Sequence, residues 1–578
     1  MMITQVNCTK MKAPALLAAL ALGLALPLGA QAAGEEVIEL PDVTTAVSGD
    51  TLTAGKDSIP DYSSVLPGSE SGKIQLPVMD QPVSKAAAPS QAGPAVQAPE
   101  KTVYAEGQIG GGFPFLFLGD FAIYRATGNA PFSLTFTHRS AEDFASHKAE
   151  DGFFARTTAV GAVQALQTDN TSHSFTASYD TADYGLQSLS APFFDMVNHT
   201  IAASESSVFN LPYGWEISLG GSANWYNRYG GSKTGDSDLV LASNGGTVLA
   251  AAADAASHTV VFDLAPHFGF GWKNQRFAAG FTARYQLQGN LGDRDNFAKI
   301  DGSSYRNATH RGQFGVNTAF TSTYLTLRGT AGLVVGSALG KPALLAPFSL
   351  GADVRIPYDE VGDDLVLLSL EGGLDSYQQT LRELEKAYRF AYSAVLPTES
   401  SDWYGKARLS LPLFDHLSAH AGVEFRKTAF ENGVWTADYS GSRDGASGLY
   451  LLAPDERTDC SSEVGASFDR GSFTVTASWK AYWLDLPALA DRQNLLLSAA
   501  WEGSRCTLSA RWRQALGADS EKAPDLGAGA ALRLSSALRI ALEANDIVKL
   551  LTNSTRSFAH SAYKAESGNA ALLVKFQF

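Results

Sequence analysis

Apolar and polar residues alternate along most of this chain, in segments that are joined by long and short links in turn. In the last segment, 569–578, one side carries Leu572, Val574, Phe576 and Phe578, and the other carries Ala571, Leu573, Lys575 and Gln577. Side chains alternate with a period of two in an extended strand. The pattern predicts an all-β chain with many antiparallel strands.

The lengths of the links separate a membrane barrel from a soluble sandwich, whose strands alternate in the same way. Counted backwards, the long or intermediate links are 546–569, 516–525, 484–492, 428–458, 376–401, 336–344, 289–310 and 229–257. Short links such as Asn274-Gln275 and Arg470-Gly471 lie between them. Tight turns at one end and longer loops at the other are typical of a transmembrane up-and-down β-barrel. We count 22 strands, with 20 as the alternative, and expect both termini on the periplasmic side.

The first hundred residues differ from the rest. Lys10 and Lys12 precede an apolar core that ends in Ala30-Gln31-Ala32, which predicts a signal peptide over 1–32, with a membrane anchor as the alternative. Residues 33–102 are rich in Pro, Ser, Gly and Ala and predict a flexible periplasmic segment. The barrel is expected over 103–578, in the bacterial outer membrane.

The net charge and the reactive or metal-binding side chains disfavour several classes of function. With 44 basic and 59 acidic residues, the net charge is −15, which disfavours nucleic-acid binding. Cys460 and Cys506 fall on strands that are not neighbours, so we expect two free thiols. His420 and Glu424 share a strand side but lie about 13 Å apart, too far to hold one metal ion. We therefore predict no enzyme, cofactor or metal. The polar residues expected to face the lumen are Asp263, His267, Arg284, His420, Glu424 and Lys480.

One stretch breaks the alternation. Leu381, Leu384, Tyr388 and Ala391 approximate a helical stripe. This spacing is compatible with a short helix in an outer loop or the lumen, and with an extended continuation of the barrel.

Three places carry a resemblance to plug-less TonB-dependent-receptor-like barrels: the entry 104–107 through 119–120, the segment 132–140, and the run 381–384 before 402–412. The group's Asn-Pro after the last run is replaced by Ala387-Tyr388. The resemblance spans about 103–578 and implies that no plug domain precedes the barrel, since 34–102 is too short and polar for one.

Both ends of the chain also resemble parts of such proteins. The ending with Phe576 and Phe578 is similar to the signal read by the barrel-assembly machinery, although Leu573 stands where that signal usually has Gly. Residues 35–40 resemble the contact box for an energising partner, with Glu36, Val37 and Ile38 at its centre. A plain acidic linker is the alternative for this stretch.

A barrel of this width encloses more space than its own side chains fill, so it conducts solute or is closed by loops or a partner. We therefore predict transport or a pore for small solutes, embedded in outer-membrane lipid. The alternative is a surface-interaction protein, an adhesin or a scaffold for a periplasmic or lipoprotein partner, favoured by long loops rich in Gly, Ser and Asp. A hydrolase of outer-leaflet lipid ranks third.

Overall fold

The computed structural model describes residues 103–125, 130–232, 258–291, 308–338, 341–357, 365–393, 395–414, 416–429, 433–444, 447–517 and 523–578. The predicted signal peptide, 1–32, and the predicted periplasmic segment, 33–102, lie outside the described residues. The same holds for the candidate contact residues Glu36, Val37 and Ile38.

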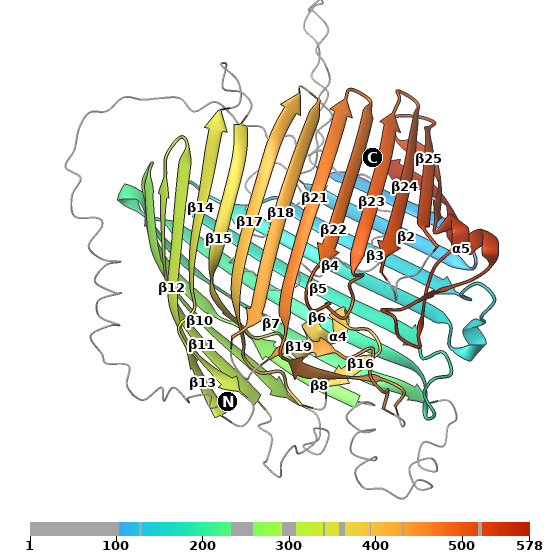
Figure 1. Cartoon of the computed structure of the whole chain (residues 1–578), viewed down its shortest axis with the longest axis horizontal. Helices are drawn as coiled ribbons and strands as arrows, with labels where there is room; N and C mark the ends of the chain where they lie inside the picture. Colours follow the sequence, from blue (N-terminus) through green and yellow to red (C-terminus); the bar gives the residue numbers. More distant parts are fainter. Residues whose placement is uncertain are drawn as a thin grey trace, which may run out of the picture. The chain divides into compact units, whose positions relative to one another are not determined.

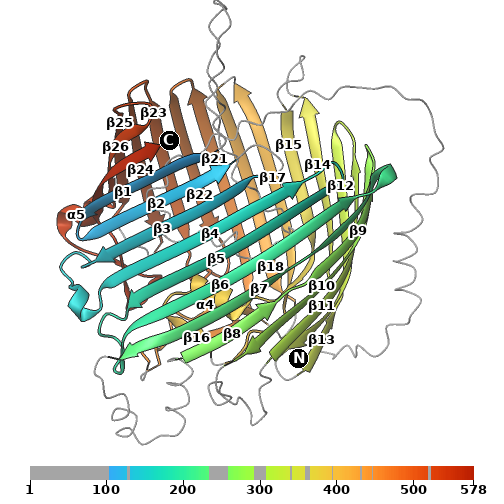
Figure 2. The same ribbon diagram turned by 180° about the vertical axis from the view of Figure 1, so that it is seen from behind.

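A closed antiparallel barrel of 22 strands forms most of the described part (Figure 1, Figure 2), which confirms the predicted fold class and strand number. The first half comprises β1 (Tyr104–Phe113), β2 (Leu116–Arg125), β3 (Phe132–Glu142), β4 (Phe154–Gln167), β5 (Thr171–Gly185), β6 (Phe193–Asn210), β7 (Trp215–Ser232), β8 (His258–Leu264), β9 (His267–Lys273), β10 (Phe277–Asn290), β11 (Ala308–Thr321) and β12 (Leu325–Ala338). The second half comprises β13 (Lys341–Leu345), β14 (Phe348–Pro357), β15 (Leu365–Tyr377), β17 (Ser400–Phe414), β18 (Leu417–Thr428), β21 (Thr458–Arg470), β22 (Phe473–Tyr482), β23 (Gln493–Glu502), β24 (Cys506–Leu516), β25 (Asp525–Arg533), β26 (Leu538–Asn545) and β29 (Asn569–Gln577).

Two barrel strands are each interrupted at a proline. β8 and β9 both pair with β7 and β10, and the chain between them holds Pro266. β13 and β14 both pair with β12 on either side of Pro347. Proline cannot donate to the ladder, so each strand is broken there without leaving the barrel. The 24 segments of the sheet therefore make 22 strands.

The last strand closes the barrel against the first, as the sequence predicted. β29 pairs with β1 along eight positions, from Glu106 opposite Gln577 to Phe113 opposite Ala570. Leu573 points inward, is 1% exposed and lies opposite Gly110. A Cβ atom on Gly110 would lie 2.4 Å from both the Leu572 carbonyl oxygen and Leu573 Cδ2. Leu573 stands where the assembly signal usually has a Gly, and the small residue at this contact is instead Gly110 of β1.

The long and short connections alternate between the two ends of the barrel. Short turns such as 274–276, 471–472 and 503–505 lie at one end, and the long loops 378–399, 429–457 and 546–568 at the other. One predicted link is wrong: 336–344 is not an intermediate loop. β12 and β13 continue their ladder through it, with Val334 opposite Leu345 and Gly336 opposite Ala343. Small residues there allow the hairpin to stay paired almost to its tip.

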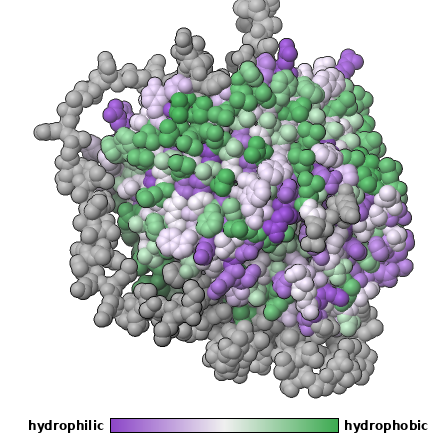
Figure 3. All heavy atoms as spheres, viewed as in Figure 1, coloured by the Kyte–Doolittle hydropathy of each residue, from purple (hydrophilic) through white to green (hydrophobic). Residues whose placement is uncertain are grey.

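The outward face of the barrel is largely apolar. On β29, Leu572 is 55% exposed, whereas Leu573, one residue on, is buried inside. Trp215 and Trp483 are exposed at strand ends, where an interfacial girdle places aromatic residues. Figure 3 shows hydrophobic residues over the strands of one face and hydrophilic residues gathered toward the lower part, where the long loops lie. Cys460 and Cys506 lie on β21 and β24 and are free, as predicted.

The remaining elements belong to loops. They are the helices α4 (Leu381–Ala387) and α5 (Ile547–Thr552), the 3₁₀ helices η3 (Ala149–Asp151) and η4 (Pro212–Gly214), and the strands β16 (Ala391–Ser393), β19 (Val434–Ala437), β20 (Tyr450–Asp455), β27 (Arg556–Ser557) and β28 (Lys564–Ala565). α4 confirms the helical interpretation of the stripe: Leu381 and Leu384 are fully buried, and Thr380 and Glu383 form a capping box. Within the described residues, no helix is both long and apolar enough to cross a membrane.

Candidate functional site: loops folded into the lumen

Four loops at the long-loop end pack into one hydrophobic core, to which a fifth adds Leu489. We call the described residues of 186–192, 378–399, 429–457 and 546–568 the loop cap. Its core is fully buried and contains Leu186, Leu384, Trp435, Leu449 and Tyr563. Residues from all four loops therefore contact one another, although they are far apart in the chain. Burying large aromatic and aliphatic side chains is the main source of stability available to such a structure.

Backbone pairing also joins the loops. β16, from the loop after β15, pairs in parallel with β20, which in turn pairs antiparallel with β19. The Tyr563 hydroxyl donates to the Gly448 carbonyl oxygen at 2.9 Å, and its ring stacks on Phe390 with centroids 3.9 Å apart. Burial raises the pKa of Tyr563, which keeps this hydroxyl a donor. The loop cap is thus folded rather than a set of independent loops.

Two buried ion pairs fasten the loop cap to the barrel wall. We call them the α4 latch and the Glu399 latch. In the α4 latch, Arg228 of β7 donates from Nη1 to Glu385 Oε1 at 2.5 Å, and both side chains are at most 2% exposed. The Tyr226 hydroxyl donates to the other carboxylate oxygen, also at 2.5 Å. Burial raises the pKa of Glu385 above its ordinary value, although Arg228 acts to lower it.

The Glu399 latch lies on the neighbouring part of the wall. Arg311 of β11 donates from Nε to both Glu399 oxygens at 3.1 and 2.9 Å, and from Nη2 to the Ser376 carbonyl oxygen at 2.6 Å. Glu399 also accepts from the Ser376 hydroxyl. Burial raises the pKa of Glu399, and Arg311 again opposes this. The two latches hold the segment 378–399 against the inside of the barrel at Glu385, within α4, and at Glu399, its last residue.

The seat of α4 lies between these latches. The Leu381 backbone N–H donates to Gln288 Oε1 of β10 at 2.9 Å. Leu381 also packs with Tyr226, Val261 and Leu396 in a small buried cluster. The wall residues in this contact come from β7, β8 and β10, so the helix covers three adjacent strands. This segment therefore lies inside the barrel and not above its rim.

Three of the six predicted lumen residues lie on β8, β9 and β10. Asp263 points inward from β8 and is 2% exposed, and its oxygens accept no hydrogen bond from the described residues. His267 and Arg284 lie opposite each other on β9 and β10. Their strand parity places both inside, because Phe268 and Phe281 of the same strands are exposed on the outside.

The other three lie on a separate stretch of wall. His420 Nε2 lies 3.7 Å from Glu463, and Glu424 pairs with Lys406 at 3.6 Å and with Arg426 at 2.9 Å. Lys480 of β22 lies opposite Glu463, with its ammonium over the Tyr482 ring. The structure thus divides the six residues between two groups of strands, and their role stays a prediction. No group of metal-binding side chains occurs among the described residues.

The sequence reasoning missed the latch residues. Arg228 and Arg311 fall on inward positions of their strands, which the alternation predicts. Their partners are Glu385 and Glu399, 157 and 88 residues away in the chain. Nothing in the local pattern marks these glutamates, so the pairs become visible only when the loop folds into the lumen.

Comparisons with known proteins agree with this architecture. No family model matches the chain, and no curated protein matches it. A mutant of the ferric enterobactin receptor PfeA from Pseudomonas aeruginosa is similar, with a TM-score of 0.58 and 10% identity, over 83% of this chain and 81% of that one. The FrpB iron transporter from Neisseria meningitidis gives a TM-score of 0.59 and 10% identity, over 83% and 81%. The likeness at such low identity shows a shared fold: the chain is a 22-stranded barrel of the kind found in these iron receptors and transporters.

Proposed function

We propose that this protein is an outer-membrane transporter for a small solute, with the barrel lumen as its route and the loop cap as its closure. The observation that carries the proposal is the pair of latches. A permanent seal is best made from apolar contacts alone. The segment 378–399 instead meets the wall through two buried ion pairs, which cost desolvation, as well as through the apolar contacts of Leu381. Such contacts are suited to exchange between two arrangements.

We also propose that the protein lies in the bacterial outer membrane and meets two kinds of partner there. An apolar outer face and a closed barrel support a place in the bacterial outer membrane. Phe576 and Phe578 both lie on the outward side of the closing strand, which fits their proposed use by the assembly machinery. We also propose that the barrel lacks a plug domain, and that Glu36, Val37 and Ile38 contact an energising periplasmic partner. Crosslinking of these residues in cells tests the contact.

The names of two structurally similar proteins suggest which solute to test first. One neighbour is named for ferric enterobactin and another for iron, so a ferric chelate is the first solute to test. Uptake of ferric enterobactin by proteoliposomes should be slow with the native chain. It should rise when Arg228→Met releases the α4 latch. If uptake and single-channel current both stay at the protein-free level in the native chain and in this variant, the transport proposal is wrong.

The folded loop cap also favours a second candidate, a surface-interaction protein. A packed core with Trp435 and Tyr563 would give a rigid outer surface for a partner. In this case opening the latches would abolish partner binding without creating any flux. Measuring flux and cell-surface binding on the same Arg228→Met variant therefore separates the two functions.

A further inference from the structure

The outward face of β4, β5 and β6 carries polar side chains inside the apolar belt. We call them the outer polar patch: Gln164, His173, Glu205 and Ser207. On β6 the outward residues run from Ile201 and Ala203 through the patch to Phe209, so apolar residues flank the patch on both sides. The carboxylate therefore lies within the stretch that would face lipid.

The patch is connected across strands. His173 Nδ1 and the Ser207 hydroxyl form a hydrogen bond of 2.6 Å, and the same hydroxyl donates to Glu205. Gln164 and Glu205 flank Phe175 from either side in the register. Ser207 is buried, whereas Glu205 and Gln164 are exposed on the outer surface. Donor and acceptor groups thus stand side by side and remain open to a partner.

Another part of the wall, separated from β4 by four strands and on the other side of the closing seam, shows what a lipid-facing surface of this chain looks like. The outward residues of β25 and β26 are all apolar: Leu526, Ala528, Ala530, Leu532, Leu538, Ile540, Leu542 and Ala544. A charged group on the lipid face of a barrel is unfavourable, and an unsatisfied polar group in hydrocarbon is costly. The outer polar patch therefore needs an explanation other than contact with lipid.

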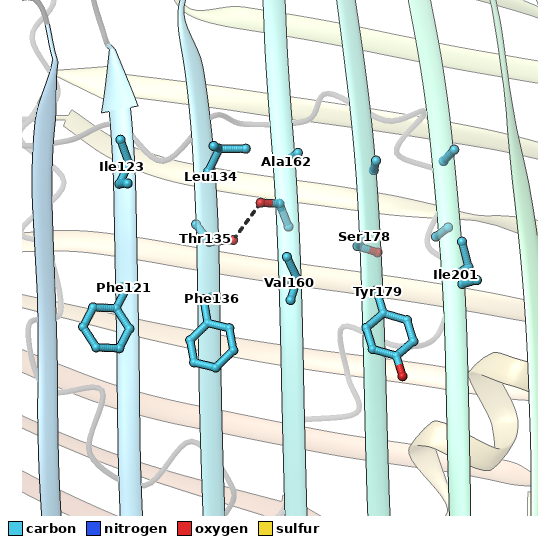
Figure 4. A pocket seen from close by; sticks show the side chains of 14 residues that line it. Phe121, Ile123, Leu134, Thr135, Phe136, Val160, Ala162, Ser178, Tyr179 and Ile201 are labelled. Carbon is cyan, nitrogen blue, oxygen red and sulfur yellow. Dashed lines mark hydrogen bonds between the residues drawn. The ribbon is translucent and has the colours of Figure 1, made fainter.

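A groove lies directly beside the patch. Ala162, Ala177 and Ala203 stand in one register row across β4, β5 and β6. They line a groove with a volume of about 550 Å³, together with larger residues that include Val160 and Ile201 (Figure 4). Small residues let another backbone approach closely, which is how protein segments associate within membranes. Groove and patch together form one continuous outer face.

We propose that this face is the interface with a second copy of the chain. Copies inserted in the same direction are related by an axis along the membrane normal, so every residue keeps its depth. The patch of one copy then meets the patch of the other, and Glu205 can accept from His173 or Gln164 of its neighbour. Lipid offers no donor to that carboxylate within the hydrocarbon layer. An unrelated partner would need a matching polar row at the same depth.

The first test is disulfide crosslinking in native outer membranes, using the full chain. Cys460 and Cys506 both face outward, so they are first replaced by Ser. In this background Ala203→Cys should give a disulfide-linked dimer on oxidation. The matched control is Ala530→Cys, which is also outward but on the apolar wall, and it should stay monomeric. Equal crosslinking of the two variants, or none, overturns the proposal.

The second test measures mass in mild detergent. Glu205→Leu should shift the particle from the mass of two chains to that of one, while heat-modifiable gel mobility confirms that the barrel is folded. A native chain that is already monomeric and retains lipid in native mass spectrometry overturns the proposal and places lipid in the groove. Both readouts report oligomeric state, so they are independent of whether the protein transports a solute.

Discussion

Breaking the α4 latch from one side should open the loop cap. Arg228→Met removes the cation and leaves the Glu385 carboxylate buried, with the Tyr226 hydroxyl and the Ser393 backbone N–H as remaining donors. Removing one partner of a buried pair costs about 3–5 kcal/mol. At about 1.4 kcal/mol per factor of ten, the equilibrium for releasing the segment 378–399 shifts by roughly two to three and a half powers of ten. Because both side chains are at most 2% exposed, we expect the cost of breaking this pair to lie near the upper end of that range.

The assay is amide hydrogen exchange of the segment 378–399, read in the refolded barrel by mass spectrometry. Faster exchange should be confined to the loop cap, while the barrel strands keep their protection. The control is Arg328→Met, which removes a half-exposed lumen pair with Asp353 and should change exchange little.

A double variant distinguishes the effect of an unpaired buried charge from the effect of lost packing. Replacing a whole buried ion pair by apolar residues is often neutral, so Arg228→Met with Glu385→Met should recover much of the protection lost in the single variant. If the single variant exchanges like the native chain, the pair does not hold the loop. If the double variant opens further than the single one, the penalty comes from lost packing and not from an orphaned charge.

Three further outcomes are expected. Gly110→Ala should impair folding, because its Cβ atom would collide with the terminal strand, whereas Gly111→Ala has its nearest neighbour at 3.5 Å and should fold; heat-modifiable gel mobility separates them. Tyr563→Ala should destabilise the loop cap by about 3–5 kcal/mol and expose its loops to protease, while the barrel stays resistant. For pH, the raised pKa values of Glu385 and Glu399 mean that folding disfavours their charged forms. The stability of the loop cap therefore rises as pH falls from above the raised pKa values toward the ordinary pKa of a glutamate. Its amides should be at least as well protected from exchange at pH 5 as at pH 7.5. Faster exchange at pH 5, after correction for the intrinsic exchange rate, would contradict this prediction.

The strands could be predicted from the sequence because each one carries its own evidence. Leu572 and Leu573 are neighbours in the chain, yet the period of two correctly assigns the first to the outside and the second to the inside. The same rule placed Asp263 inside, but it could not show that α4 covers this residue. Whether a lumen residue meets water or a loop depends on contacts between distant segments. The link 336–344 failed for a related reason, since small residues there permit either a loop or a tight hairpin.

The connections of the loop cap also set the order in which the molecule can be built. Gln187 exchanges two hydrogen bonds with the backbone of Lys564, and Arg139 pairs with Glu566, across 377 and 427 residues. Contacts between such distant positions form late, because long chain closures must come first. The final loop lies between the last two barrel strands, so these contacts can form only when the C-terminal end of the chain is in place. The loop cap is therefore completed only in the last step of assembly. A chain truncated before 546 should lose these late contacts along with the seam, but keep the latches of the segment 378–399, which need only residues before 400.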